Sequence, residues 1–376
     1  VPTAYEAMQY ALAADGVGID PNDEHGRVSP SSKVAWTHPS NEARYLTGVL
    51  GMAGGLRRAK QFLLHPFLRE IFANLGGSPT LPTTQMMPTI NRLQKKFRRQ
   101  DYFDLTSDGE RQALADLIVK AAREIKSPMD YVSHDDLRKR WKIYRETFWA
   151  ANRLQGTDHN VDWDRHEEES LDECLVELRR RQMMYQGHRW TCRKCHHRNW
   201  VDLGALSPEL SCEVCKQRTQ APVNISWLFR PNEFLMDSLR DHSVLSLVWV
   251  LSALCERSRR SLAFIEPTWF GFNHESEKPD AEADLLVFLD GQAVLCEVKS
   301  SWRSLRLTDI EKLITLSVRL RPDIALLAVM ENGSGPATEL ADAHRRLAGE
   351  GIRFELLTPN LYDVPNNPYL HFDDER

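Results

Sequence analysis

The sequence predicts a multidomain protein of mixed class, α plus α/β, and three observations predict it. Apolar residues recur at helical spacing between about residues 41 and 186. Two C-x-x-C pairs follow in a short polar stretch. Beyond them, five short runs rich in β-branched, Leu and aromatic residues are interspersed with helical segments, as in an α/β domain with a central mixed sheet flanked by helices. We therefore expect a helical domain, a small cysteine-held module and a C-terminal α/β domain.

Composition bounds the class of protein. The chain has 376 residues, of which 42% are hydrophobic, and its 48 Lys+Arg against 53 Asp+Glu give a formal net charge of -5. Such a chain can bury a core in two or three domains, and its charge excludes a basic surface over the whole molecule. Three basic blocks with interspersed aromatic residues, at 92–100, 138–145 and 179–198, can still neutralise phosphates locally.

No run of about 18 apolar residues is present, and the N-terminus lacks the basic-then-apolar layout of a signal peptide. These two absences predict a cytoplasmic protein without a membrane partner.

Composition shifts set the expected domain boundaries. Residues 1–40 are rich in Pro, Ser, Gly and Asp and are predicted to form an irregular N-terminal arm. A helical domain is expected over 41–186, the cysteine module over 187–226, and the α/β domain over 227–376.

The cysteine module is predicted from spacing. Sixteen residues separate the pair Cys192 and Cys195 from the pair Cys212 and Cys215. This spacing lets two short loops offer four thiolates to one tetrahedral Zn²⁺, which closes the coordination sphere and makes the metal structural. The segment resembles a zinc ribbon of the rubredoxin-like type.

Cations and flat rings gather around the first cysteine pair, a combination that suits phosphates and unstacked bases. Trp190 and Trp200 can either stack on bases or pack the module, and the sequence leaves both readings open. The residues predicted to contact nucleic acid here are Arg189, Arg193, Lys194 and Arg198.

The α/β domain is expected to begin with an amphipathic helix, or a pair of helices, over 229–258. Strands and helices then follow in a fixed order along the chain. The predicted strands are 261–272, 283–290, 292–300, 324–330 and 352–359, and the predicted helices are 309–320 and 337–351.

Charged residues interrupt the second and third of these strands. Asp290-Gly291 is a favourable hairpin turn, so the two strands should pair as antiparallel neighbours. Because side chains alternate along a strand, Glu297 and Lys299 fall on one face, and the hairpin folds Asp284 back beside them. The three charged groups are expected to converge.

Two carboxylates that meet in this way repel each other unless a cation lies between them, and oxygen ligands suit Mg²⁺ or Mn²⁺. A neighbouring lysine can orient a metal-bound water or help to deprotonate it. Together these groups can attack a phosphodiester.

This pattern resembles the PD-(D/E)xK nuclease superfamily, which has the restriction-endonuclease-like fold, over about residues 235–360. The resemblance implies that Asp284 and Glu297 are metal ligands and that the main-chain carbonyl of Val298 completes the coordination. It also implies that Lys299 is the catalytic lysine.

Three further expectations follow from the resemblance. The family often adds an acidic residue from the preceding helix, and Glu256 is the best match, although a solvent-exposed helix-end carboxylate fits its position equally well. The literal Pro-Asp dipeptide ends at Asp280, which keeps Asp280 as an alternative to Asp284. Downstream, Arg303 and Arg306 are candidate phosphate contacts.

The sequence therefore predicts a Mg²⁺- or Mn²⁺-dependent endonuclease acting on DNA, with RNA as the other substrate that the same chemistry allows. The helical domain and ribbon would position nucleic acid or a partner, an arrangement that resembles prokaryotic antiviral or restriction-type defence effectors. The alternative is a non-catalytic nucleic-acid-binding or adaptor protein that docks a partner subunit through its ribbon. An oligomer is compatible with either function.

Overall fold

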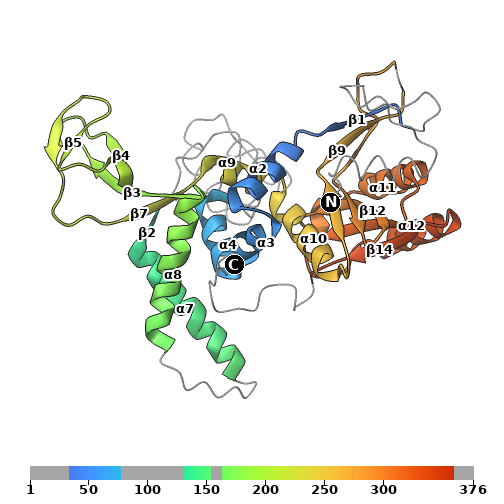
Figure 1. Ribbon diagram of the computed structural model, residues 1–376, viewed down its shortest axis with the longest axis horizontal. Coiled ribbons are helices and arrows are strands. Elements are labelled where there is room, and N and C mark those ends of the chain that lie inside the picture. The colour runs from blue at the N-terminus through green and yellow to red at the C-terminus, as the bar shows by residue number, and fades with distance from the viewer. Residues whose placement is uncertain (1–33, 78–130, 154–162, 274, 360–376) are drawn as a thin grey trace, which may run out of the picture. The chain divides into compact units, whose positions relative to one another are not determined.

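The computed structural model of the chain describes residues 34–77, 131–153, 163–273 and 275–359 (Figure 1). Most of the predicted arm and the basic block 92–100 lie outside the described residues. The described part is mixed α/β, with helices and several sheets. Within it, no helix combines the length and the apolar character that a membrane span requires.

The chain folds as two compact units, each assembled from separated stretches of sequence, whereas the predicted domains follow one another along the chain. Of the described residues, unit 1 contains 34–69, 144–153, 163–183 and 242–359 without 274, and unit 2 contains 70–77, 131–143 and 184–241.

Unit 1 is built on a five-stranded mixed sheet with the order β14-β13-β12-β11-β8. β12, β13 and β14 are parallel, and β11 runs antiparallel to both of its neighbours. The strands are β8 (Leu262–Ile265), β11 (Leu285–Leu289), β12 (Gln292–Lys299), β13 (Ile324–Val329) and β14 (Arg353–Leu357).

The predicted strand 261–272 is in fact two strands in two different sheets. β8 ends at Ile265, and β9 (Thr268–Gly271) pairs instead with β1 (Trp36–Pro39) and β10 (Ala281–Ala283). Pro267 lies between β8 and β9 and has no N–H to donate to a sheet, which favours the break there.

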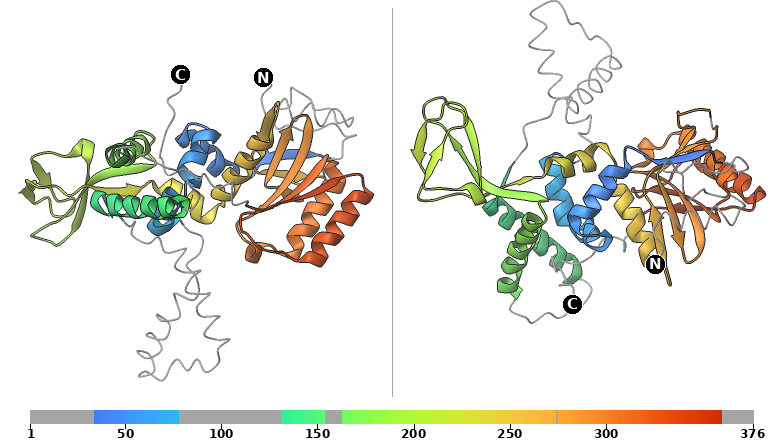
Figure 2. Two further views of the ribbon diagram at one scale, coloured as in Figure 1. Left: turned by 90° about the horizontal axis from the view of Figure 1, so that it is seen from below. Right: turned by 45° about the horizontal axis from the view of Figure 1, so that its top comes forward.

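Two helices cover one face of the five-stranded sheet. α11 (Leu307–Leu320) and α12 (Ala337–Gly349) pack buried side chains such as Leu313 and Leu347 against Leu295 of β12. Each such side chain contributes about 1.5–3 kcal/mol by its removal from water. α10 (Val244–Arg257) is buried over most of its surface and lies on the other side of the sheet (Figure 2).

Seven further helical segments of the described residues come from the first half of the chain, and a short η5 (Trp302–Ser304) follows β12. The seven are α2 (Ala43–Ala53), α3 (Leu56–Ala59), η1 (Lys60–Leu64), α4 (Pro66–Phe72), η2 (Ala73–Gly77), α7 (His134–Arg153) and α8 (Trp163–Arg180).

Unit 2 contains a four-stranded antiparallel sheet with the order β2-β7-β3-β4 and a separate hairpin of β5 and β6. The strands are β2 (Val132–Ser133), β3 (Met184–Thr191), β4 (Arg198–Asp202), β5 (Glu209–Ser211), β6 (Arg218–Gln220) and β7 (Leu228–Pro231), with a short η4 (Leu203–Ala205) after β4.

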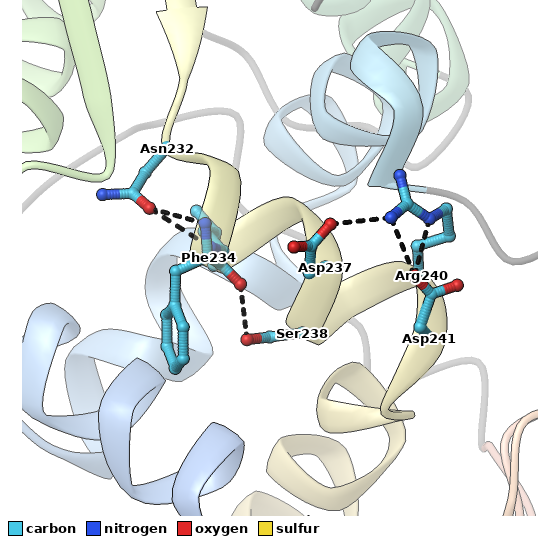
Figure 3. A network of polar contacts seen from close by, with 7 residues as sticks. Asn232, Phe234, Asp237, Ser238, Arg240 and Asp241 are labelled. Atoms are coloured by element: carbon cyan, nitrogen blue, oxygen red, sulfur yellow. Dashed lines mark hydrogen bonds and ion pairs between the residues drawn. The ribbon is translucent and has the colours of Figure 1, made fainter. Parts of the chain in front are cut away.

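Of the single helix or pair of helices predicted over 229–258, the structure forms the pair, preceded by a strand that the prediction did not include. Asn232 stands between β7 and α9 (Glu233–Asp241), and its Oδ1 accepts hydrogen bonds from the backbone N–H groups of Phe234 and Leu235, at 2.9 and 3.4 Å (Figure 3). This is the N-cap arrangement, which fixes the start of a helix. At the other end, Arg240 pairs with Asp237 and with Asp241, both at 2.7 Å. α9 belongs to unit 2 and α10 to unit 1.

Candidate active site and metal centre

The four predicted zinc ligands lie together in unit 2. Their sulfur atoms are all within 4.8 Å of one another, with Cys192 3.5 Å from Cys215 and Cys195 3.6 Å from Cys212. In the part of the chain that the structure describes, this is the one group of three or more His, Cys, Asp or Glu side chains whose ligand atoms approach so closely. The gathering of the four cysteines is confirmed, and four thiolates at these distances can hold one tetrahedral metal such as Zn²⁺.

Both cysteine pairs adopt the same local backbone. In each, the first cysteine donates its N–H to the carbonyl five residues on, and the residue after the second cysteine has a positive φ. The bonds run from Cys192 to His197 (2.8 Å) and from Cys212 to Gln217 (2.9 Å), and the φ angles are 56° at His196 and 58° at Lys216. The two loops are therefore equivalent knuckles.

Backbone N–H groups favour the thiolate form of one cysteine in each pair. The N–H groups of Cys195 and Lys194 lower the pKa of Cys192. Burial alone would raise the pKa of Cys212, but N–H groups that include that of Cys215 outweigh it and bring the pKa to about 6. The N–H of His197 lowers the pKa of Cys195, but burial and the other three thiols outweigh it and raise this pKa to about 12. Thiolates are the form that binds metal, so a bound Zn²⁺ would displace the proton of Cys195.

The second site lies on the hairpin of β11 and β12 in unit 1. Asp290 and Gly291 form its turn, with φ angles of 51° and 88°. The strands pair from Leu289 opposite Gln292 outward to Leu285 opposite Cys296, which confirms the predicted antiparallel hairpin. The next position outward places Asp284 opposite Glu297, on the same side of the sheet.

Asp284 is anchored to the backbone of β12. Its Oδ2 accepts a hydrogen bond of 2.6 Å from the N–H of Val298, which leaves Oδ1 for another ligand. Because the N–H and C=O of one strand residue project to the same side, the Val298 carbonyl also projects toward the side of Asp284. The three predicted oxygen ligands, from Asp284, Glu297 and Val298, therefore come from adjacent positions.

Lys299 completes this group from the same face of β12. Its Nζ lies 2.7 Å from Glu297 Oε1, and Glu297 is only 8% exposed. The same Nζ atom of Lys299 lies 3.8 Å from Oδ2 of Asp309. Asp309 is in the first turn of α11 and is 9% exposed. Sequence reasoning assigned Asp309 to a helix but missed it as a site residue, and the signal that points to it is a carboxylate in the first turn after the lysine strand.

Burial shifts the pKa values of Asp284 and Glu297 upward, and a neighbouring negative charge adds to each shift, that of Glu297 for Asp284 and that of Asp309 for Glu297. Burial, with a further contribution from the charge of Glu297, raises the pKa of Asp284 to about 8. Burial also raises the pKa of Glu297. For Lys299, burial opposes the charge, but Glu297 and Asp284 outweigh it and raise the lysine pKa. Three carboxyl groups, those of Asp284, Glu297 and Asp309, lie around this one lysine, and a divalent cation that bound Asp284 and Glu297 would displace the proton of Asp284.

Two carboxylates that the sequence offered lie elsewhere. Glu256 forms an ion pair with Lys60, and its side chain is 52% exposed. Asp280 accepts a hydrogen bond of 2.7 Å from the N–H of Phe272 and shapes the connection between β9 and β10. Of the two candidate aspartates, Asp284 is the one that the hairpin places opposite Glu297.

The residues predicted to contact nucleic acid are dispersed over both units. Arg193, Lys194 and Arg198 are exposed on the cysteine module of unit 2, and Arg303 and Arg306 are exposed between β12 and α11 of unit 1. Arg189 is half-buried, with its guanidinium carbon 5.4 Å from the centre of the Tyr131 ring.

No protein-family model matches the chain, and no curated protein sequence matches it.

The raised pKa of Asp284 predicts that Asp284→Asn stabilises the protein at alkaline pH when no Mg²⁺ or Mn²⁺ is added. In the folded protein Asp284 keeps its proton up to about pH 8. In the unfolded chain the same carboxyl group loses its proton near pH 4. Between these values the unfolded state binds fewer protons, so stability falls as pH rises. We expect the Asn variant to melt at least about 2 °C higher than wild type at pH 8.5, and the gap to close toward pH 5. Calorimetry at both pH values measures this, and an equal gap at both would contradict it.

Proposed function

We propose that unit 1 is a divalent-metal-dependent nuclease of the PD-(D/E)xK type that hydrolyses phosphodiester bonds of DNA. One observation carries the proposal: the register of the hairpin, extended by one residue, sets Asp284 opposite Glu297, and Lys299 reaches Glu297 at 2.7 Å. The order of elements supports it, since α10, β8, β11, β12, α11, β13, α12 and β14 occur in the order that the resemblance implies for about residues 235–360, with β9 and β10 of a second sheet between β8 and β11.

Asp284 Oδ1, the carboxylate of Glu297 and the carbonyl of Val298 would hold the metal. When bound, Mg²⁺ or Mn²⁺ polarises a phosphoryl oxygen and lowers the pKa of a bound water. Lys299 donates a hydrogen bond to the attacking water or to a phosphoryl oxygen, and its positive charge offsets the charge that develops on the phosphate. Four thiolates around one Zn²⁺ would leave no open coordination position, so the cysteine module is assigned a structural role.

The proposal is tested with supercoiled plasmid, circular single-stranded DNA and an RNA transcript, each with Mg²⁺, with Mn²⁺ and with neither. We expect metal-dependent nicking of at least one DNA substrate. Circular substrates have no ends, so their cleavage establishes internal cutting. Calorimetry with Mn²⁺ supplies a second measurement, because Asp284→Asn should abolish metal binding at this site. If no substrate is cut and calorimetry detects no such binding, the nuclease proposal is wrong, and a non-catalytic binding or adaptor function becomes the better explanation.

We predict that Asp309→Asn slows the reaction without weakening substrate binding. Asp309 Oδ2 accepts from the N–H of Arg306 at 2.9 Å, and Asn keeps an oxygen for that bond while it removes the charge that faces Lys299. Loss of the charge should lower kcat about 10-fold, equivalent to about 1.4 kcal/mol, with KM unchanged. Rates on a fluorogenic oligonucleotide measure both constants. The matched control is Glu311→Gln on the exposed side of α11, and equal kcat values for the two variants would assign Asp309 to helix capping alone.

A further inference from the structure

One face of the four-stranded sheet in unit 2 combines cations and rings that come from all four of its strands or their ends. Arg189 of β3 pairs with Trp200 of β4, and Tyr185 of β3 pairs with Arg230 of β7. Tyr131 immediately precedes β2, one position beyond Val132, which pairs with Phe229. Because cross-strand partners share a face, the strand register brings these five side chains to one side, which we call the Arg-aromatic face.

These side chains form one layered stack. The Tyr131 and Trp200 rings are 5.0 Å apart and nearly parallel, at 23°. Arg189 covers Tyr131 at 5.4 Å, and Arg230 lies 4.9 Å from the Trp200 ring and 5.2 Å from the Tyr185 ring. Guanidinium groups held against rings in this way lose much of their rotational freedom.

The backbone is shaped to accept this stack. A Cβ placed on Gly187 would collide with the Trp200 ring and with the carbonyl of Val201, so the indole lies directly over a glycine. The indole Nε1 of Trp200 also donates a 2.7 Å hydrogen bond to Asp202. The position of the Trp200 indole is therefore fixed by its contact with Gly187 on one ring face and by its hydrogen bond to Asp202 at the ring edge.

Charge on the Arg-aromatic face is positive. Arg198 pairs with Thr191, so it lies on the same side as Arg189 and Arg230. The same face carries an acidic residue, Asp202, which lies 3.9 Å from Arg230. Three positive charges and one negative charge leave a net charge of two positive. A guanidinium that stacks on a ring uses its flat surface, which leaves N–H groups at its edge for phosphate oxygens, although the Nε of Arg230 is buried.

The opposite face of the same sheet belongs to the core. Met184, Asn199 and Phe229 are buried there, at 1–3% exposure. The Arg-aromatic face is instead formed by half-buried and exposed side chains. A ligand of the sheet therefore has one face to bind.

We infer that the Arg-aromatic face binds the sugar–phosphate backbone of duplex DNA and does not read bases. The choice of DNA rests on the proposed function, while the anion site rests on the three arginines. The Tyr131, Trp200 and Tyr185 rings already contact one another or a guanidinium, so stacking by unpaired bases would have to displace these contacts. Duplex phosphates need only the guanidinium edges.

The test is the salt dependence of binding by the zinc-loaded chain of 376 residues without Mg²⁺ or Mn²⁺, measured by anisotropy of a labelled 20-base-pair duplex. Each phosphate contact adds about 0.9 to the slope of log K against log salt for duplex DNA. We expect Arg189→Ala, Arg198→Ala and Arg230→Ala each to reduce the slope by about 1 and to weaken binding several-fold for all sequences alike. Arg218→Ala on β6, which removes an exposed arginine outside the face, is the matched control.

Zinc content and melting temperature identify a variant that has merely unfolded, and Arg189→Lys supplies a second measurement because it keeps the charge and therefore the slope. Unchanged slopes in all three Ala variants, with DNA still cut by the wild type, would overturn this inference and leave the nuclease proposal standing. Tighter binding of a single strand than of the duplex would overturn the duplex assignment. Absence of both binding and cutting counts against the proposed function itself.

Discussion

Asp284→Asn and Lys299→Ala are each expected to reduce Mg²⁺-dependent cleavage of plasmid DNA by about two orders of magnitude or more. The first change removes an oxygen that we propose as a metal ligand, on the residue that one further step of the hairpin register sets opposite Glu297, and the second removes the cation 2.7 Å from Glu297. Since we propose that both groups act on the same reacting phosphate, the double variant should be little worse than either single variant. Initial rates of nicking measure the effect.

Controls for these variants come from the same unit. Glu277→Gln and Lys278→Ala change exposed residues of the β9–β10 connection by the same chemistry and should retain full activity. Glu256→Gln distinguishes two expectations. The family resemblance implies that Glu256 is a site residue and that its loss lowers activity, whereas the ion pair of Glu256 with Lys60 on the surface leads us to expect an active variant. Wild-type rates in both Asp284→Asn and Lys299→Ala would refute the site.

Cys212→Ser is expected to abolish stoichiometric zinc and to unfold the cysteine module. The four sulfur atoms lie within 4.8 Å of one another. We expect a bound metal to hold the two knuckles together, because the thiols by themselves attract one another only weakly. Structural Zn²⁺ contributes about 10–16 kcal/mol of apparent binding free energy in small zinc modules, which makes this loss larger than that of any single packing contact. Metal analysis and limited proteolysis of the residues 192–218 measure the two outcomes.

The matched control is Cys255→Ser. Cys255 is an exposed free cysteine of α10 in unit 1, and its replacement should leave the zinc content at one per chain. Retention of one zinc and of protease resistance by Cys212→Ser would show that Cys212 is not a ligand.

Local sequence signals predicted the parts whose determinants are local. Asp290-Gly291 specifies a tight turn through its backbone preferences, and the register that follows from this turn brings Asp284 opposite Glu297. The C-x-x-C spacing likewise defines each knuckle within six residues. For the same reason, the helices α11 and α12 lie within three residues of their predicted bounds.

Predictions were wrong where a distant partner decides. Phe229 looked like the start of a helix, but pairing of β7 with β3 makes it a strand residue. One continuous apolar run supplied β8 to one sheet and β9 to another, because β9 finds its partner in β1, more than two hundred residues earlier in the chain.

The sequence by itself determined the turn, the strand alternation and the cysteine spacing. From these it identified Asp284, Glu297 and Lys299 as candidate site residues, and the four cysteines as one cluster. These features depend on dihedral preferences and side-chain periodicity over a few residues. Only the tertiary structure decided that Asp309 faces Lys299, that Glu256 pairs with Lys60, and that Tyr131 joins Trp200 and Arg230 on one face. Such contacts join residues brought together by burial of apolar surface and by strand pairing, and no short-range pattern encodes which distant side chain arrives.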